Sequence, residues 1–349
     1  MRTAAFEAGI DRQLSVAPMM DWTDRHCRFF LRGFSPRTLL YTEMITAEAL
    51  LRGDAARLLH YSPEEHPLAL QLGGSDPARL AQAARLGEQA GYVEINLNCG
   101  CPSDRVHAGA FGACLMATPA RVAECVAAMR AAVSVPVTVK MRIGIIDGAK
   151  AANGRSRAAG AAQVPLRTRL AAYDDADYQR LFNFTAVVSA AGCAVFIVHA
   201  RQAVLGGLSP KENRDVPPLR PEVVQRLAAQ FPRQQFVING GLRTVAQARD
   251  ALGWSPGVML GREAYHRPYI LSELHQQLFD DGWQRPSERS LLERMACYAS
   301  RETLAGEPLK AITRHMFGLY AGQGGARAFR SRLAEGSRRH DAAPDFFLY

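Results

Sequence analysis

Short runs of apolar and β-branched residues alternate along the chain with longer stretches in which apolar residues recur at helical spacing. Nearly continuous apolar runs of this kind are typical of parallel strands covered on both faces. Eight strands are predicted, over Leu14–Met20, Leu39–Ile45, Leu68–Gly73, Tyr92–Asn98, Val137–Ile143, Val195–Arg201, Gln235–Gly240 and Gly257–Gly261. Helices are predicted between them, over Asp76–Ala90, Pro119–Val133, Asp174–Ala191, Arg220–Gln230 and Thr244–Leu252. Eight repeats within about 260 residues favour a closed (β/α)8 barrel, the TIM-barrel form of the α/β class, over an open sheet.

The pattern changes after Arg267. Pro268–Tyr349 has helical periodicity and no convincing strand, so we expect a barrel domain over residues 1–266 and a small all-helical domain over 267–349. From Lys310 to His340 there are seven Lys or Arg residues and one acid, Glu335. A solvated basic face would explain this imbalance, but its size favours contact with a polyanion.

One segment fits neither pattern. Gly148–Ala172 carries five basic residues and no acid, and it separates the fifth strand from its helix. It is predicted to be a flexible basic insertion. Two interpretations stay open, a passive surface loop and an arm that contacts RNA.

Composition limits the class of protein. The chain has 349 residues, of which 48% are hydrophobic, enough for a large core. A net charge of +9 suits an anionic partner or a basic enzyme kept soluble by its charge. Met1–Gln13 contains no apolar signal segment, and no uncharged run is long enough to cross a bilayer, so no membrane role is expected.

The cysteines indicate the compartment and argue against a metal. None of the seven forms a CxxC pair, and the histidines lack zinc spacing, so no metal site is expected. An odd count without a signal peptide indicates a reducing cytoplasm. The seven are Cys27, Cys99, Cys101, Cys114, Cys125, Cys193 and Cys297.

A candidate reactive thiol follows the fourth predicted strand. Asn96–Ser103 places two asparagines and a cysteine pair where the strand opens into a loop, and catalytic groups of such barrels sit at the C-terminal ends of strands. The Gly-rich run His107–Cys114 suggests that this loop is mobile. By position alone the thiol could be a nucleophile, a metal ligand or a proton donor.

The other strand ends suggest a cofactor site. Glycines after strands seven and eight expose backbone N–H groups suited to a phosphate. Lys140 and Gln71 suit the polar edge of a planar heterocycle, and Lys140 could stabilise negative charge on a reduced flavin. The strand-end residues are Ala17, Pro18, Met19, Gln71, Lys140, Arg142, His199, Arg201, Asn239, Gly240, Gly241, Gly261 and Arg262. They do not by themselves separate FMN from another phosphate-bearing ligand.

In this order, the motifs resemble the tRNA-dihydrouridine synthases, specifically the A-type subfamily, over roughly residues 14–340. The longest matching runs are Leu14-Ser-Val-Ala-Pro-Met-Met-Asp-Trp-Thr-Asp24, His66-Pro-Leu-Ala-Leu-Gln-Leu-Gly-Gly-Ser75, Glu94-Ile-Asn-Leu-Asn-Cys-Gly-Cys-Pro-Ser103, Val137-Thr-Val-Lys-Met-Arg-Ile-Gly144 and Leu208-Ser-Pro-Lys-Glu-Asn-Arg214. The resemblance implies an FMN enzyme that reduces the C5–C6 double bond of uridine 20, and of 20a, in the tRNA D-loop with NADPH as electron donor. A monomer is expected, although the sequence does not fix the oligomeric state.

The resemblance also assigns roles. The flavin would be lined by Ala17, Pro18 and Met19 and contacted by Gln71, Lys140 and His199. Its phosphate end would be held by Asn239, Gly240, Gly241, Gly261 and Arg262. Cys101 matches the general acid and Asn98 a residue that contacts the target uridine. Lys211 with Arg214, and Arg327 with Arg330, match two tRNA-contacting pairs. The absence of a GxGxxG fingerprint is consistent with NADPH entering through the substrate opening.

The implied chemistry separates the possible roles of the thiol. Hydride reaching C6 leaves an enolate that needs a proton at C5, and a thiol with an ordinary pKa of about 8.5 is mostly protonated at neutral pH. The neighbouring Cys99 is either a buried small hydrophobe that packs beneath Cys101 or a reserve acid or redox partner. Two rival functions remain, a flavin barrel enzyme acting on a free pyrimidine and an RNA-binding protein without catalysis.

Overall fold

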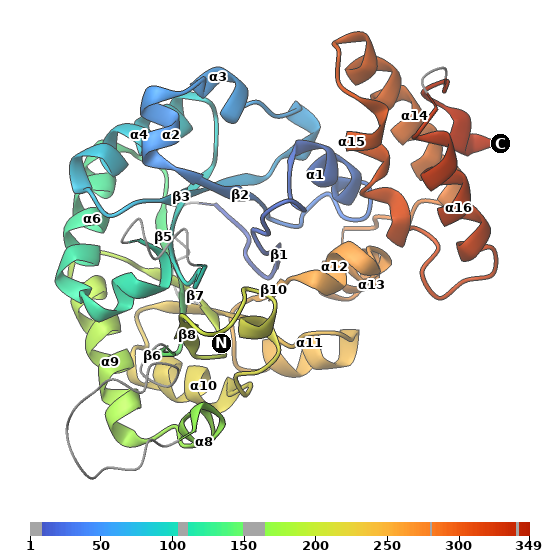
Figure 1. Cartoon of the computed structure of the whole chain (residues 1–349). Coiled ribbons are helices and arrows are strands. Elements are labelled where there is room, and N and C mark those ends of the chain that lie inside the picture. Colours follow the sequence, from blue (N-terminus) through green and yellow to red (C-terminus); the bar gives the residue numbers. More distant parts are fainter. Residues whose placement is uncertain (1–8, 104–110, 149–164, 280, 340–341) are drawn as a thin grey trace.

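Eight parallel strands form one sheet that closes on itself (Figure 1). The computed structural model describes residues 9–103, 111–148, 165–279, 281–339 and 342–349. The strands are β1 (Leu14–Val16), β2 (Leu40–Thr46), β3 (Leu68–Gly73), β4 (Glu94–Cys99), β5 (Val137–Arg142), β7 (Val195–His199), β9 (Gln235–Asn239) and β10 (Val258–Leu260). Their order is β1-β10-β9-β7-β5-β4-β3-β2, and a bridge between Ser15 and Leu39 joins the two ends. The predicted (β/α)8 barrel is confirmed.

Helices surround the barrel, and local capping explains where several of them begin. Asp76, Asp174 and Thr244 each accept a hydrogen bond from a backbone N–H in the first turn of the helix that follows. The helices of this layer are α1 (Arg25–Arg32), α2 (Ala47–Arg52), α3 (Ala55–Leu58), α4 (Pro77–Gln89), α6 (Pro119–Ala132), α8 (Leu166–Ala171), α9 (Asp175–Ala190), α10 (Pro221–Gln230), α11 (Val245–Leu252) and α12 (Arg262–His266).

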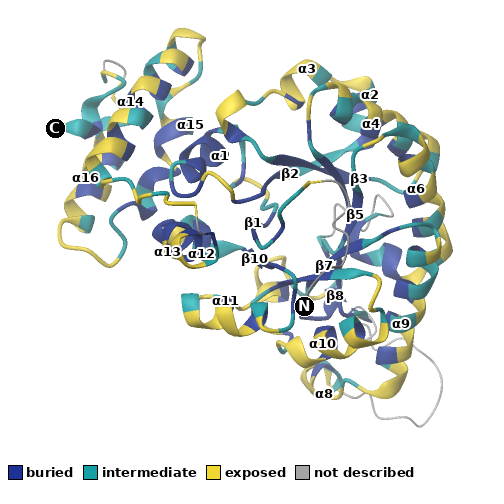
Figure 2. Ribbon diagram, turned by 180° about the vertical axis from the view of Figure 1, so that it is seen from behind, coloured by how far each residue is buried: buried dark blue, intermediate teal, exposed yellow. Residues whose placement is uncertain are grey.

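Alternate strand residues face two different apolar layers, and the strands are almost wholly buried (Figure 2). Ile95, Leu97 and Cys99 belong to the layer between strands and helices. The inner layer of the barrel is small and is built from Ala17, Leu39, Tyr41, Ala69, Val195, Ile197, Val237 and Met259. Since side chains alternate along a strand, Glu94, Asn96 and Asn98 point into the barrel.

Three local predictions need correction. The first strand ends at Val16 instead of Met20, because Pro18 has no N–H to donate and the Thr23 hydroxyl bonds Met19 to form a turn. Two short strands, β6 (Ile145–Asp147) and β8 (Ala203–Leu205), form a separate parallel pair that was not predicted. Within the predicted insertion, Leu166–Ala171 is helical, while residues 149–164 lie outside the described part.

Beyond the barrel, the described residues form helices joined by loops and no strand. These helices are α13 (Tyr269–Leu278), α14 (Glu288–Leu304), α15 (Leu309–Thr313) and α16 (Ala326–Gly336). The first of them packs on the end of α1, where the Ser272 hydroxyl donates to the Phe34 carbonyl at 2.8 Å. On α14, Tyr298 stacks on Phe29 of α1 with ring centroids 3.9 Å apart. None of the described helices is long and apolar enough to span a bilayer.

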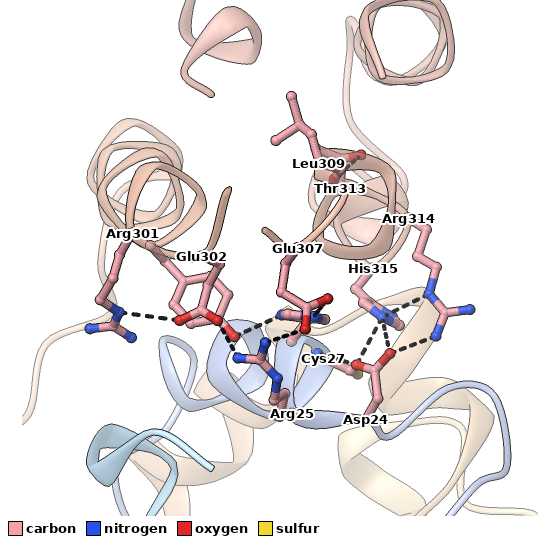
Figure 3. Close-up of polar contacts among 12 residues, drawn as sticks. Asp24, Arg25, Cys27, Arg301, Glu302, Glu307, Leu309, Thr313, Arg314 and His315 are labelled. Atoms are coloured by element: carbon pink, nitrogen blue, oxygen red, sulfur yellow. Dashed lines mark hydrogen bonds and ion pairs between the residues drawn. The ribbon is translucent and has the colours of Figure 1, made fainter. Parts of the chain in front are cut away.

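A cluster of ion pairs and hydrogen bonds joins the start of α1 to the helical part (Figure 3). Asp24 caps α1 by accepting from the Cys27 N–H, and it also accepts from Arg314 at 2.6 Å and from His315 at 3.0 Å. The next residue, Arg25, pairs with Glu302 and Glu307. Burial alone would raise the pKa of Asp24, but His315, the cap and Arg314 outweigh it and hold that pKa well below its usual value.

We predict that Asp24→Ala lowers the free energy of unfolding by about 2–3 kcal/mol, because it removes a helix cap and two ion-pair partners together. Asp54→Ala is the matched control, since Asp54 caps the short α3 through the Arg57 N–H and is exposed. Urea unfolding monitored by circular dichroism measures both. The contribution of Asp24 is present above about pH 4 and fades as the pH falls below that value, because its folded-state pKa is the lower one. Equal losses in the two variants would contradict the prediction.

Candidate functional site

Asn98 holds the reactive-thiol candidate at the C-terminal rim of the barrel. Its Oδ1 accepts from the backbone N–H groups of Gly100, at 3.1 Å, and Cys101, at 3.0 Å. The turn leaves Cys101 half-buried, with Sγ 3.5 Å from the Ser103 hydroxyl. The Ala113 N–H donates to the Cys101 carbonyl at 2.9 Å, which ties both ends of the loop together. Residues 107–110 of the loop predicted to be mobile lie outside the described residues.

Cys99 has a different environment. It is fully buried, as its interpretation as a small hydrophobe required, and burial raises its pKa well above the ordinary value. It does not lie beneath Cys101, because the strand alternation turns it into the layer between the strands and the helices. The two thiols therefore serve different layers of the molecule.

Gln71 and Lys140 flank Asn98 on the neighbouring strands. The Asn98 Nδ2 donates to Gln71 Oε1 at 2.8 Å, and Lys140 lies directly beside Asn98 in the strand register. The Lys140 Nζ donates to Asn239 Oδ1 at 3.2 Å. Burial, reinforced by the positive charge of Arg142, lowers the pKa of Lys140 to about 7. This is the behaviour of a cation held ready for an anionic or electron-rich ligand.

His199 and the glycine pair complete the opposite wall. His199 pairs in register with both Arg142 and Asn239. Burial, followed by the charges of Arg142 and Lys140, lowers the pKa of His199 well below its ordinary value, so the imidazole is neutral. Gly240 has φ +105°, and a Cβ there would lie 2.9 Å from the His199 Nε2. Gly241 has φ +73° and would clash with Leu219, so both positions require glycine.

Arg262 is already paired in the structure. It makes a bidentate contact with Asp215, at 2.6 and 3.2 Å. The hydrogen bond from Arg262 lowers the pKa of Asp215 and outweighs the opposing effect of burial. Gly261, directly before it, precedes α12, and Met19 Sδ lies 4.0 Å from its would-be Cβ. Ala17 is buried in the inner layer, and Pro18 is half-buried at the rim.

Arg142 is a site residue that the sequence pattern placed at a strand end without a role. It is buried and donates to the Gly100 carbonyl at 3.3 Å and to the Asn213 carbonyl at 2.9 Å. It therefore links the Cys101 loop to the turn that carries Lys211 and Arg214. Its spacing of two from Lys140 was the available signal, because that spacing puts both side chains on the inner face.

The two predicted tRNA-contacting pairs lie in different places. Lys211 and Arg214 are exposed on the turn beside the rim. Arg327 and Arg330 are exposed on α16, a helix that lies away from the barrel (Figure 1). The structure thus gathers the predicted cofactor and thiol residues at one rim but separates the second arginine pair from them.

The geometry defines a class first, a barrel enzyme in which a half-buried thiol follows β4 and a half-buried lysine lies on the neighbouring strand β5. The family model described as dihydrouridine synthase (Dus) matches residues 15–159 and 152–346. The chain belongs to this family. It is 51% identical over 326 residues to the tRNA-dihydrouridine(20/20a) synthase of Pseudomonas syringae pv. tomato, covering 93% of this chain and 89% of that protein.

Two further relatives carry the same name. The protein of Xanthomonas axonopodis pv. citri is 51% identical over 332 residues, which are 95% of this chain and 90% of the relative. The protein of Escherichia coli O6:H1 is 48% identical over 332 residues, which are 95% of this chain and 92% of the relative. The similarity extends across the barrel and the helical part alike.

We predict that Lys140 makes the free energy of unfolding depend on pH in the alkaline range. Its folded-state pKa lies below its unfolded value, so between about pH 7 and 10 the unfolded chain binds more protons and stability rises with pH. In dialysed protein, the unfolding free energy of the wild type relative to Lys140→Met should therefore increase across this range. Lys211→Met provides the control, since it removes an exposed lysine outside the barrel interior. Parallel curves for wild type and Lys140→Met would refute the assignment.

Proposed function

We propose that this protein reduces the C5–C6 double bond of uridine in tRNA to 5,6-dihydrouridine, at positions 20 and 20a of the D-loop. FMN is the proposed cofactor and NADPH the proposed electron donor. The observation that carries the proposal is the placement of Cys101, which Asn98 holds at the rim next to Lys140. The names of the relatives supply the substrate and its positions.

The residues present fit a phosphate-bearing flavin. Gly240 and Gly241 present backbone with no room for side chains, which suits close approach of a phosphate. Gly261 and Arg262 would hold the same end, with Arg262 exchanging Asp215 for the phosphate. The ring and ribityl end would be held by Gln71, Lys140, His199 and Asn239. The site would be lined by Ala17, Pro18 and Met19. Binding an electron-rich ring would restore the full positive charge of Lys140.

The mechanism uses few groups of the protein. FMN held by these residues and reduced by NADPH would supply the hydride for C6 of the uracil ring. Cys101 Sγ then donates its proton to C5, and Asn98 and Arg142 fix the loop from which it does so. Because the target base is stacked in folded tRNA, it must be extruded into the rim at a cost of about a few kcal/mol. Contacts with tRNA phosphates would offset that cost, and they would come from Lys211, Arg214, Arg327 and Arg330.

A flavin barrel enzyme acting on a free pyrimidine is the alternative. It accounts for the rim but leaves the exposed arginines of α16 without a ligand. Reduction of free uridine as efficient as reduction of tRNA would favour it. A purified protein that binds tRNA but cannot be loaded with FMN would instead favour the non-catalytic alternative. The cytoplasmic location and the monomeric state remain predictions.

We predict that Cys101→Ala retains FMN and tRNA binding but loses at least about 99% of dihydrouridine formation, since general acid catalysis contributes about 100-fold or more. Cys99→Ala is the matched control, because its thiol is next but one in sequence and faces the opposite layer. Mass spectrometry of nucleosides from treated tRNA measures the product. Turnover by Cys101→Ala at the rate of Cys99→Ala would remove Cys101 from the mechanism.

We predict that replacing both Arg327 and Arg330 with Ala weakens tRNA binding uniformly and reduces the slope of log Kd against log salt by about 1 for each lost phosphate contact. The control replaces Arg85 on α4 and Arg249 on α11, two exposed arginines on the outer wall of the barrel. Filter binding between 50 and 300 mM salt, roughly the range where such contacts dominate, gives both slopes. An unchanged slope in the α16 variant would mean that these arginines do not touch phosphate.

A further inference from the structure

A chain of hydrogen-bonded polar side chains runs through the interior of the barrel from the start of β4 to its rim. All its members are at most 7% exposed, deep in an otherwise apolar fold. From the bottom upward they are Glu94, Thr138, Asn96, Gln71 and Asn98. The links measure 2.7 Å, 2.8 Å, 2.7 Å and 2.8 Å in that order.

The lower end of the chain is fixed by a carboxylate. Glu94 pairs with the Arg12 Nε at 2.7 Å and accepts from the hydroxyls of Tyr41, at 2.6 Å, and Thr138, at 2.7 Å. A carboxylate can only accept, so Thr138 must donate its one proton downward. Its oxygen must then accept from the Asn96 amide above it, and this sets the orientation of that amide.

The upper end is fixed by backbone donors. The Asn98 Oδ1 accepts from two N–H groups, those of Gly100 and Cys101, which can only donate. The Asn98 Nδ2 must therefore point to Gln71 Oε1, and the Gln71 Nε2 to Asn96 Oδ1. Both ends therefore fix the same donor-to-acceptor direction for every hydrogen bond, from Asn98 down to Glu94. The amides consequently have a single orientation in which every link is satisfied.

We propose that Glu94 is a positioning residue for Cys101, acting through this chain by fixing the direction of its hydrogen bonds. It touches neither the thiol nor the rim, and no link of the chain is redundant. The inference rests on the proposed function only for its catalytic consequence, because the positioning of the Cys101 loop can be measured without turnover.

The substitution Glu94→Gln keeps the shape of the side chain and brings a donor to its end. An NH2 facing Arg12 would set two donors against each other, so the new amide would turn its NH2 toward Thr138 and Tyr41. Thr138 would then donate upward and reverse Asn96. The reversed orientation would pass through Gln71 and bring its NH2 group against the Asn98 Nδ2. Asn98 would then either turn over, releasing the N–H groups of Gly100 and Cys101, or leave two NH2 groups facing each other.

Glu65 offers a closely matched control. It is also fully buried, and its carboxylate also lies 2.7 Å from an arginine Nε, that of Arg28. It accepts from the Ser62 N–H in a short helical turn outside the barrel, and its contacts do not reach the rim. Glu65→Gln therefore reproduces the loss of a buried ion pair without disturbing the chain.

The experiment compares both variants by timed alkylation with iodoacetamide, following the Cys101 peptide by mass spectrometry with the exposed Cys297 as internal standard. Release of two hydrogen bonds should raise the Cys101 rate of Glu94→Gln by about fivefold or more over both wild type and Glu65→Gln. With tRNA as substrate, kcat should fall in Glu94→Gln while KM is unchanged. Equal Cys101 rates in the two variants would overturn the proposal. A wild type that forms no dihydrouridine would refute the proposed function, yet the alkylation rates would still decide the role of Glu94.

A second pair keeps the proposal testable if Glu94→Gln does not fold. Thr138→Val breaks the chain but leaves Glu94 paired with Arg12 and Tyr41. Thr185→Val is its control, a fully buried threonine of α9 whose hydroxyl bonds the Leu181 carbonyl at 2.9 Å. Thr138→Val should raise the Cys101 rate at least about twofold over Thr185→Val. Equal rates in this pair would overturn the proposal.

Discussion

Closure of the barrel is the constraint on which the rest of the structure depends. The backbone bonds of Leu39 to Leu14 and Val16 join the second strand to the first and leave the sheet without an edge. Because all eight strands are parallel, their C-terminal ends meet at one rim, and alternate residues of each strand face inward. Residues far apart in sequence, such as Lys140 and Asn239, meet inside the barrel for this reason.

A second constraint follows from burying polar groups inside that ring. An unpaired amide or carboxylate in the barrel interior would be costly, so each must find a partner on a neighbouring strand. The chain from Glu94 to Asn98 meets this requirement and ends on the N–H of Cys101. Stability and the geometry of the rim are in this way parts of one network, and Lys140, whose pKa is lowered to about 7, is the group that burial leaves ready for a ligand.

The sequence predicted the elements whose signal is local and missed those that depend on distant partners. All eight barrel strands were predicted from their apolar runs, and their alternation was enough to place the rim. The pair β6 and β8 was missed because three-residue strands beside glycines have too little periodicity to detect. The pairing of Arg262 with Asp215 and of Glu94 with Arg12 was missed because neither spacing nor residue type reveals a partner 47 or 82 positions away. The roles of the rim residues came from a family resemblance, to which the structure adds their hydrogen-bond partners.

The central claim is that the rim performs a reduction on two defined uridines of tRNA. The most direct measurement incubates purified, FMN-loaded protein and NADPH with unmodified tRNA and maps dihydrouridine along the chain by nuclease digestion and mass spectrometry. The account predicts dihydrouridine at positions 20 and 20a of the D-loop. Product at other positions only, or none in folded tRNA while free uridine is reduced, would contradict it.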